Sequence, residues 1–97
     1  MHIPGFAIET AERDGVLEIK LSGELDLGTV DQVSAALDGG DGHDQLVIDT
    51  TAVTFIDSTG LAALLDLSDR FGGERFTLIP GERVRRLLEI SGTSGFF

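Results

Sequence analysis

The sequence contains no cysteine, which excludes disulfide bonds and thiol chemistry. It also has no apolar run of the roughly 18 residues that a membrane-spanning helix needs. The first residues, Met1–Gly5, lack the charged and apolar regions of a secretory signal peptide. The lack of cysteine alone does not determine the cellular compartment. Without a signal peptide or a membrane-spanning segment in view, we expect the default location, the cytoplasm.

Basic residues are few, with seven Lys and Arg against 17 Asp and Glu and a formal net charge of −10. Nucleic acids and anionic lipids are themselves negative, so an acidic surface disfavours binding to either. We therefore expect neither nucleic acid nor a membrane as a partner, whereas a basic protein surface would fit. Composition alone favours the simpler interpretation that the acids keep a small domain soluble.

The patterns of common catalytic sites are missing as well. A serine hydrolase elbow reads Gly-x-Ser-x-Gly, and Ile56 stands where the first glycine would precede Ser58. His43, the only histidine besides His2, falls in a glycine-rich segment and is interpreted as a solvated loop residue rather than a general base. Neither a phosphate-binding Gly-x-x-x-x-Gly-Lys loop nor Cys/His metal spacing occurs. We predict a protein that is not an enzyme and has no cofactor and no metal.

The first half of the chain predicts a hairpin followed by a helix. Phe6–Glu12 and Val16–Ser22 alternate like strands, and Asp14-Gly15 between them tolerates the positive φ of a tight turn. The segment Gly23–Gly28 predicts a break in the second strand. A helix capped at Gly28 or Thr29 would then present Val30, Val33 and Leu37 on one side, and a loop would cover Asp38–Asp44.

The stretch Leu46–Leu67 organises the rest of the chain. Leu46–Ile48 predicts a buried strand that ends at Asp49, followed by a turn and by Thr54–Ile56. Asp57 and Ser58 are both favourable N-cap residues for a helix with leucines at helical spacing, which Gly72-Gly73 would end after Phe71.

The last part predicts a strand at Phe76–Ile79 and a helix from Glu82 to about Ser91. Gly92–Gly95 would be a loop, and Phe96-Phe97 could start a short strand. With 97 residues, of which 41% are hydrophobic, the chain is expected to form one domain, 1–97. Two strands followed by alternating helices and strands predict an α/β fold, a mixed β-sheet covered by helices.

Ser58 and three aspartates are the candidate functional residues. A serine at a helix start is either a plain cap or a place for a phosphate, because free N–H groups and the helix dipole favour an anion there. Asp26, Asp49 and Asp57 each follow a predicted strand, where α/β folds gather their sites. They could hold Mg²⁺, as in phospho-aspartate receiver domains. Such a site also needs a lysine to meet the phosphoryl group, and the sole lysine, Lys20, is placed in a strand that precedes Asp26. Structural roles such as turn capping are therefore favoured.

The sequence resembles the STAS domains, specifically the bacterial anti-sigma factor antagonists. The resemblance rests on Phe55-Ile56-Asp57-Ser58-Thr59-Gly60-Leu61, on Gly23-Glu24-Leu25-Asp26 and on Val47-Ile48-Asp49. It implies that Ser58 is phosphorylated by a partner that is both a serine protein kinase and an anti-sigma factor. It further implies that the unphosphorylated form binds this partner and frees the sigma factor, and that a phosphoserine phosphatase resets the switch. Thr93 departs from the leucine that usually follows the glycine matching Gly92.

From the same resemblance we expect the partner to contact the loop after the second strand and the helix start. The expected contact residues are Glu24, Leu25, Asp26, Asp57, Thr59, Gly60 and Leu61. Two rivals stay open: a STAS scaffold or transporter-associated subunit in which Ser58 is unmodified, and an enzyme with Ser58 as its nucleophile.

Overall fold

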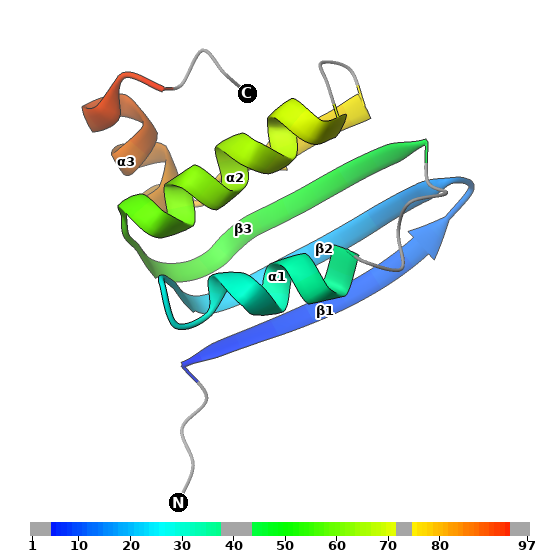
Figure 1. Ribbon diagram of the computed structural model, residues 1–97, viewed down its shortest axis with the longest axis horizontal. Coiled ribbons are helices and arrows are strands. Elements are labelled where there is room, and N and C mark those ends of the chain that lie inside the picture. The colour runs from blue at the N-terminus through cyan, green and yellow to red at the C-terminus, as the bar shows by residue number, and fades with distance from the viewer. Residues whose placement is uncertain (1–4, 38–43, 72–74, 94–97) are drawn as a thin grey trace, which may run out of the picture.

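The protein forms one four-stranded mixed sheet with helices over one face, in a computed structural model that describes residues 5–37, 44–71 and 75–93 (Figure 1). The sheet order is β1-β2-β3-β4, with β1 and β2 antiparallel and the other neighbours parallel. The strands are β1 (Phe6–Arg13), β2 (Val16–Leu25), β3 (Gln45–Ile56) and β4 (Phe76–Ile79), and the helices are α1 (Val30–Leu37), α2 (Ser58–Phe71) and α3 (Glu82–Ser91). The predicted fold class is confirmed.

The predicted hairpin joins β1 to β2. Its turn is Asp14-Gly15, with φ of 52° and 82°, a backbone region in which glycine and aspartate are more readily accommodated than most residues. Alternation along β2 places Leu17, Ile19 and Leu21 in the core, as expected from their spacing. Glu18 and Lys20 point to the opposite face, which α1 and α2 do not cover (Figure 1).

One hydrophobic core lies between the sheet and the helices. Leu46 and Ile48 of β3 meet the leucines that line one side of α2, and Val84 and Leu88 of α3 join the same cluster. Burying an aliphatic side chain of this size contributes about 1.5–3 kcal/mol. The core therefore fixes how α2 lies on β3, and with it the position of the helix start that carries Ser58.

Two strands, β2 and β3, run well past the ends that the sequence predicts, and β1 is one residue longer. β2 runs through Gly23 to Leu25, and β3 runs without interruption to Ile56, where a turn after Asp49 had been expected. Between the pairs Lys20–Asp49 and Ser22–Ala52, β3 has one residue more than β2, and between Gly23–Val53 and Glu24–Phe55 it again has one more. These bulge-like shifts absorb the turn-forming residues without ending the strand, so the prediction of a turn was wrong.

α3 begins where β4 ends and packs against the continuation of β3. The Thr50 side chain is fully buried there; its Oγ1 donates to the Ile79 carbonyl (2.9 Å) and accepts from the Gly81 N–H (3.3 Å). Gly81 lies against the backbone of Thr50 and Thr51, where a Cβ would clash. Thr50 thus ties the end of β4 and the start of α3 to β3.

The helix bounds agree with the sequence. α2 ends at Phe71, and α3 spans Glu82–Ser91 and closes with Gly92 at φ 74°, whose N–H reaches the carbonyls of the last turn. No helix in the described ranges is long and apolar enough to cross a membrane. His43, residues 38–43 of the expected loop, and the expected strand at Phe96-Phe97 lie outside the described residues.

Candidate functional site

The candidate site lies at the carboxyl ends of β2 and β3. Leu25 pairs with Ile56 at the end of the two strands, and the Asp57 N–H donates to the Leu25 carbonyl at 3.4 Å. The Glu24–Asp26 segment is thereby placed beside the start of α2, as expected from the sequence. Both segments reach the same end of the sheet (Figure 1).

Asp57 caps α2. Its Oδ1 accepts the Gly60 N–H at 2.9 Å, and its carbonyl accepts the Leu61 N–H at 2.9 Å. A capping carboxylate satisfies a backbone donor that the helix itself leaves unpaired. Ser58 is the first residue of the helix and is exposed. Of the two cap candidates, Asp57 therefore holds the cap, and the Ser58 hydroxyl stands outside it.

Gly60 sets the distance between the two segments. A Cβ on this residue would fall within 3.0 Å of the Leu25 carbonyl oxygen and would crowd the Ile56 and Leu25 side chains. Gly60 is buried and its φ lies outside the left-handed range, so space rather than backbone conformation requires glycine here. The backbone of β2 can approach the first turn of α2 only because this side chain is absent.

Thr29 holds the loop between β2 and α1. Its hydroxyl accepts the Asp26 N–H at 2.9 Å and donates to the Glu24 carbonyl at 2.8 Å. The Asp26 Oδ1 in turn accepts the Gly28 N–H at 3.0 Å. Thr29 directly precedes α1, as predicted, yet its hydroxyl bonds the loop before it rather than the helix after it. The sequence signal for this role is the Asp-x-x-Thr spacing of local side-chain turns, which was not recognised.

The expected contact residues differ in exposure. Leu25 is 0% exposed, Leu61 is 7% exposed and Gly60 is buried, so these three lie in the interior. Glu24, Asp26, Asp57 and Thr59 are partly exposed beside the exposed Ser58. Leu27, which the sequence did not single out, has 73% of its surface exposed in the adjacent loop. The accessible surface around Ser58 is thus acidic with one prominent leucine.

The three aspartates do not converge. Asp49 lies within β3 opposite Lys20, whereas Asp26 and Asp57 lie at the strand ends. The described residues contain no group of three or more His, Cys, Asp or Glu side chains placed to share a metal ion. Each aspartate accepts a backbone N–H near it in sequence, a contact that is typical of a structural role.

The structure lowers the pKa of Asp49. The Thr51 N–H donates to its Oδ1 at 2.9 Å and the Thr51 hydroxyl at 2.7 Å. The backbone hydrogen bond is the main reason why the pKa of Asp49 lies below its ordinary value; the hydroxyl and the Lys20 charge act in the same direction, and partial burial opposes them. The ionised carboxylate is thus favoured in the folded protein.

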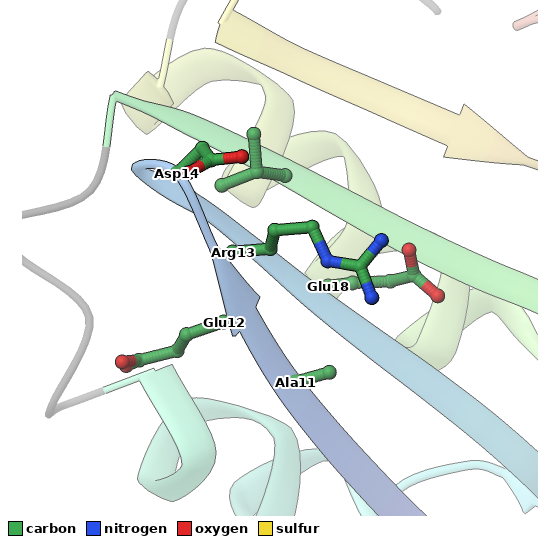
Figure 2. A pocket seen from close by; sticks show the side chains of 6 residues that line it. Ala11, Glu12, Arg13, Asp14 and Glu18 are labelled. Carbon is green, nitrogen blue, oxygen red and sulfur yellow. The ribbon is translucent and has the colours of Figure 1, made fainter.

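A shallow hollow of about 560 Å³ lies at the other end of the sheet, at the hairpin. Figure 2 shows the Arg13 and Glu18 side chains extending to one side of the strands, with Ala11 beside them, while Glu12 points away. This hollow is far from Ser58 along the strands, since β2 begins at the hairpin and ends at the candidate site.

The fold and the site together define the class of protein. It is a small α/β domain in which a capped helix begins with an exposed serine. The sequence matches the model of the STAS domain over residues 7–97. The chain therefore belongs to the STAS domain family.

Two curated relatives are similar to nearly the whole chain. The anti-sigma-B factor antagonist of Staphylococcus aureus is 33% identical over 90 residues, covering 88% of this chain and 83% of the relative. The anti-sigma F factor antagonist of Paenibacillus polymyxa is 36% identical over 91 residues, covering 88% of this chain and 78% of the relative.

Solved structures show the same fold. The crystal structure of an anti-sigma factor antagonist from Mycobacterium paratuberculosis superposes with a TM-score of 0.84 and 29% identity, covering all of this chain and 87% of that one. A sulfate transporter family protein from Wolinella succinogenes is also similar, with a TM-score of 0.66 and 21% identity, covering 86% of this chain and 71% of that one. At that identity the second similarity concerns the fold alone.

Proposed function

We propose that this protein is an anti-sigma factor antagonist switched by phosphorylation at Ser58. Its unphosphorylated form binds an anti-sigma factor that is also a serine protein kinase, and so frees the sigma factor. Phosphorylation of Ser58 ends the binding, and a phosphoserine phosphatase restores it. The names of the two curated relatives and of the Mycobacterium structure support the antagonist function.

The observation that carries the switch is the position of Ser58. The residue is exposed and is the first of α2, and the helix cap is supplied by Asp57. Its hydroxyl is therefore open to a kinase and can be modified without loss of the capping bond. Modifying or replacing a residue that served as the cap would lower the stability of the protein by about 1 kcal/mol.

A phosphate at this position is compatible with the fold. It adds about −1.5 to −2 charges and three acceptor oxygens, and a helix N-terminus favours an anion. In a complex, the same group would be pressed against the partner beside Asp57, at the end of the sheet where Asp26 follows β2. An unpaired charge in a desolvated contact costs several kcal/mol, and each ~1.4 kcal/mol is a tenfold loss of affinity. Release then needs no unfolding.

The exposed residues around Ser58 define the surface that the kinase would contact. Glu24, Asp26, Asp57 and Thr59 offer accessible atoms around Ser58. Leu25, Gly60 and Leu61 act from the interior by holding the loop and the helix start at a fixed distance. Acidic side chains at this face fit a basic surface on the kinase and would mainly raise the association rate and set the register.

The protein acts in this scheme as a regulatory binding protein rather than an enzyme, and we place the exchange in the cytoplasm. A transporter-associated or scaffold role with an unmodified Ser58 is the rival. The fold is shared by both, so only the chemistry at Ser58 separates them.

The deciding experiment is a kinase assay. Anti-sigma factor kinases encoded in the same genome are purified and incubated with this protein and ATP, and intact mass is recorded. The parent is expected to gain one phosphate, and Ser58→Ala none. Thr59→Ala is the control for the site of modification: it removes the neighbouring hydroxyl and should still gain one phosphate, whatever its effect on the rate through the contact surface. A phosphate that persists in Ser58→Ala, or a parent that no such kinase binds or modifies, would refute the proposal.

A further inference from the structure

A groove with mixed apolar and basic lining lies beside the candidate site. It has a volume of about 190 Å³ and is lined by Phe55, Ile56, Arg83, Arg86, Leu87 and Ile90. Two of these side chains are large, apolar and open to solvent: Phe55 is 48% exposed and Ile90 is 76% exposed. Exposed apolar side chains gathered in one depression are typical of a contact surface.

The exposure of Phe55 results from the irregularity of β3. Val53 is buried and Ile56 packs against the core, although a regular strand turns residues three apart to opposite faces. Thr54 is the additional residue at this point, between the pairs Gly23–Val53 and Glu24–Phe55. The shift returns Ile56 to the core and leaves Phe55 outside, next to α3. Such a shift re-aims a side chain at a defined position.

The charge of the groove is opposite to that of the molecule. The chain has a net charge of −10, yet α3 carries three of its seven basic residues against two glutamates. Arg83 and Arg86 line the groove, and Arg86 also lines a neighbouring hollow with Arg85, Glu82 and Glu89; Arg85 lines that hollow but not the groove. An apolar depression flanked by two arginines is complementary to a segment that combines aliphatic and acidic side chains.

We propose that this groove docks an acidic, aliphatic segment of a protein partner. Aliphatic side chains of the segment contact Phe55, Leu87 and Ile90, and its carboxylates face Arg83 and Arg86. Phe55 and Ile56 of the groove directly precede Asp57 and Ser58 in the chain, so we assign the segment to the partner that meets Ser58. The identity of that partner rests on the proposed function, whereas the chemistry of the groove does not. The contact surface of the partner would thus have two parts: a basic part that faces Glu24 and Asp26, and an acidic part that faces α3.

Two labelled peptides test the groove without the partner. Both carry the same leucines at helical spacing; the remaining positions are Glu in one and Lys in the other. The net charge of the protein alone would favour the Lys peptide. We expect fluorescence polarisation to show tighter binding of the Glu peptide, because Arg83 and Arg86 act at short range. Tighter binding of the Lys peptide would overturn the proposal.

Matched variants localise the binding. Arg83→Glu and Ile90→Asp are expected to weaken binding of the Glu peptide about tenfold, the effect of losing one good charged or apolar contact. Arg85→Glu makes the same charge change on the same helix outside the groove and should leave the affinity within about twofold. All three sites are exposed, and an unchanged melting temperature verifies the fold. Equal effects of Arg83→Glu and Arg85→Glu would contradict the proposal.

Further measurements separate the alternatives. Vesicles of phosphatidylglycerol that bind the parent but not Arg83→Glu would make the groove a membrane contact and would overturn the proposal. Glu24→Lys should leave Glu-peptide binding within about twofold while lowering affinity for the kinase. If the peptide binds but no kinase phosphorylates Ser58, the proposed function is refuted and the docking role of the groove still stands. A kinase that binds Arg83→Glu and Ile90→Asp like the parent would refute the groove and keep the proposed function.

Discussion

Gly60 in the first turn of α2 lies against the backbone of Leu25 at the end of β2, with no room for a Cβ between them. The Asp57 N–H donates to the same Leu25 carbonyl oxygen. The segment Glu24–Asp26, at the end of β2, is therefore fixed to the helix that carries Ser58 by backbone contact rather than by side chains. A partner would meet both segments as one rigid surface.

Replacing Gly60 by alanine should destabilise the protein. Alanine favours a helix over glycine by about 1 kcal/mol, but the added Cβ would collide with the Leu25 carbonyl, and backbone cannot move as a side chain can. Overpacking of this kind costs about 1–3 kcal/mol, and we expect a net loss in that range, measured by urea unfolding.

Gly28→Ala is the matched control for Gly60→Ala. A Cβ at Gly28 would meet only the Asp26 side chain at 3.4 Å, which is an ordinary contact. Its unfolding free energy should stay within about 0.5 kcal/mol of the parent, as for most surface substitutions. Equal stability of the two alanine variants would mean that the close approach of Gly60 and Leu25 has no energetic weight.

Thr50→Val tests the tie between β3 and α3. Valine has nearly the shape of threonine, but it leaves the Ile79 carbonyl and the Gly81 N–H without the partner that Thr50 supplies. Leaving a buried polar group unsatisfied costs about 1–3 kcal/mol, so urea unfolding should show a loss of that size. Thr77→Val on β4 replaces an exposed threonine and should have little effect. The interpretation of Thr50 fails if the two variants unfold alike.

The sequence predicted most elements because their signals are local. Asp14-Gly15 forms its turn from residues that favour it, and the leucine spacing of α2 predicts both a helix and its buried side. The path of β3 was not predictable in this way. Asp49 does bond the Thr51 N–H as a turn residue would, yet pairing with β2 carries the strand onward. Long-range pairing with a shifted register has no signature in a short window of sequence.

The candidate site was predicted in part for the same reason. Asp57 and Ser58 were identified as the helix start from residue type, and the structure assigns the cap to Asp57. Which side chains remain accessible depends on tertiary packing, so the burial of Leu25 and Leu61 and the exposure of Leu27 and Phe55 could not be read from residue type. An exposed Phe55 in particular depends on the register shift at Thr54.

Asp49→Asn should remove a pH-dependent contribution to stability. The pKa of Asp49 is lowered in the fold, chiefly by the Thr51 N–H, so ionisation stabilises the folded state. The contribution is complete above the unfolded-state pKa, about pH 4, and is lost as the pH falls through the lowered folded-state value. Parent and Asp49→Asn should therefore differ near neutrality and converge in acid, measured by urea unfolding across the pH range.

Thr51→Ala is the graded comparison for Asp49→Asn. It removes the hydroxyl that bonds Asp49 but keeps the backbone N–H, which has the larger influence on the pKa. Part of the pH dependence should remain in this variant. A difference between parent and Asp49→Asn that stays constant down to strong acid would show that ionisation of Asp49 does not contribute.

Glu24→Lys tests the acidic surface that this protein would present to the kinase in the proposed complex. Charges at the rim of an interface act mainly on the association rate, and salt screens them over about 10 Å at 0.1 M. We expect a several-fold loss of affinity for the kinase at low salt that shrinks at high salt, measured by surface plasmon resonance. Glu18→Lys, on the face of the sheet opposite α1 and α2, makes the same charge change away from the site and should have a smaller effect. Affinity that is indifferent to Glu24→Lys at every salt concentration would place the kinase elsewhere.

Ser58→Glu and Ser58→Ala should separate stability from binding. Ser58 is exposed, and its hydroxyl lies outside the capping bond between Asp57 and Gly60, so neither change removes a contact that the fold needs. A carboxylate in the first turn is mildly favourable, by about 0.3–1 kcal/mol, and Ser58→Glu should melt at or slightly above the parent temperature in circular dichroism. In the proposed complex the same charge would lie beside Asp57 in a desolvated contact, so affinity for the kinase, measured by calorimetry, should fall at least about tenfold. Ser58→Ala should bind like the parent and stay bound when ATP is added, because residue 58 can no longer be phosphorylated.

Two outcomes would show that release does not act through charge at this residue. One is a Ser58→Glu variant that binds like the parent, and the other is a Ser58→Ala complex that ATP dissociates.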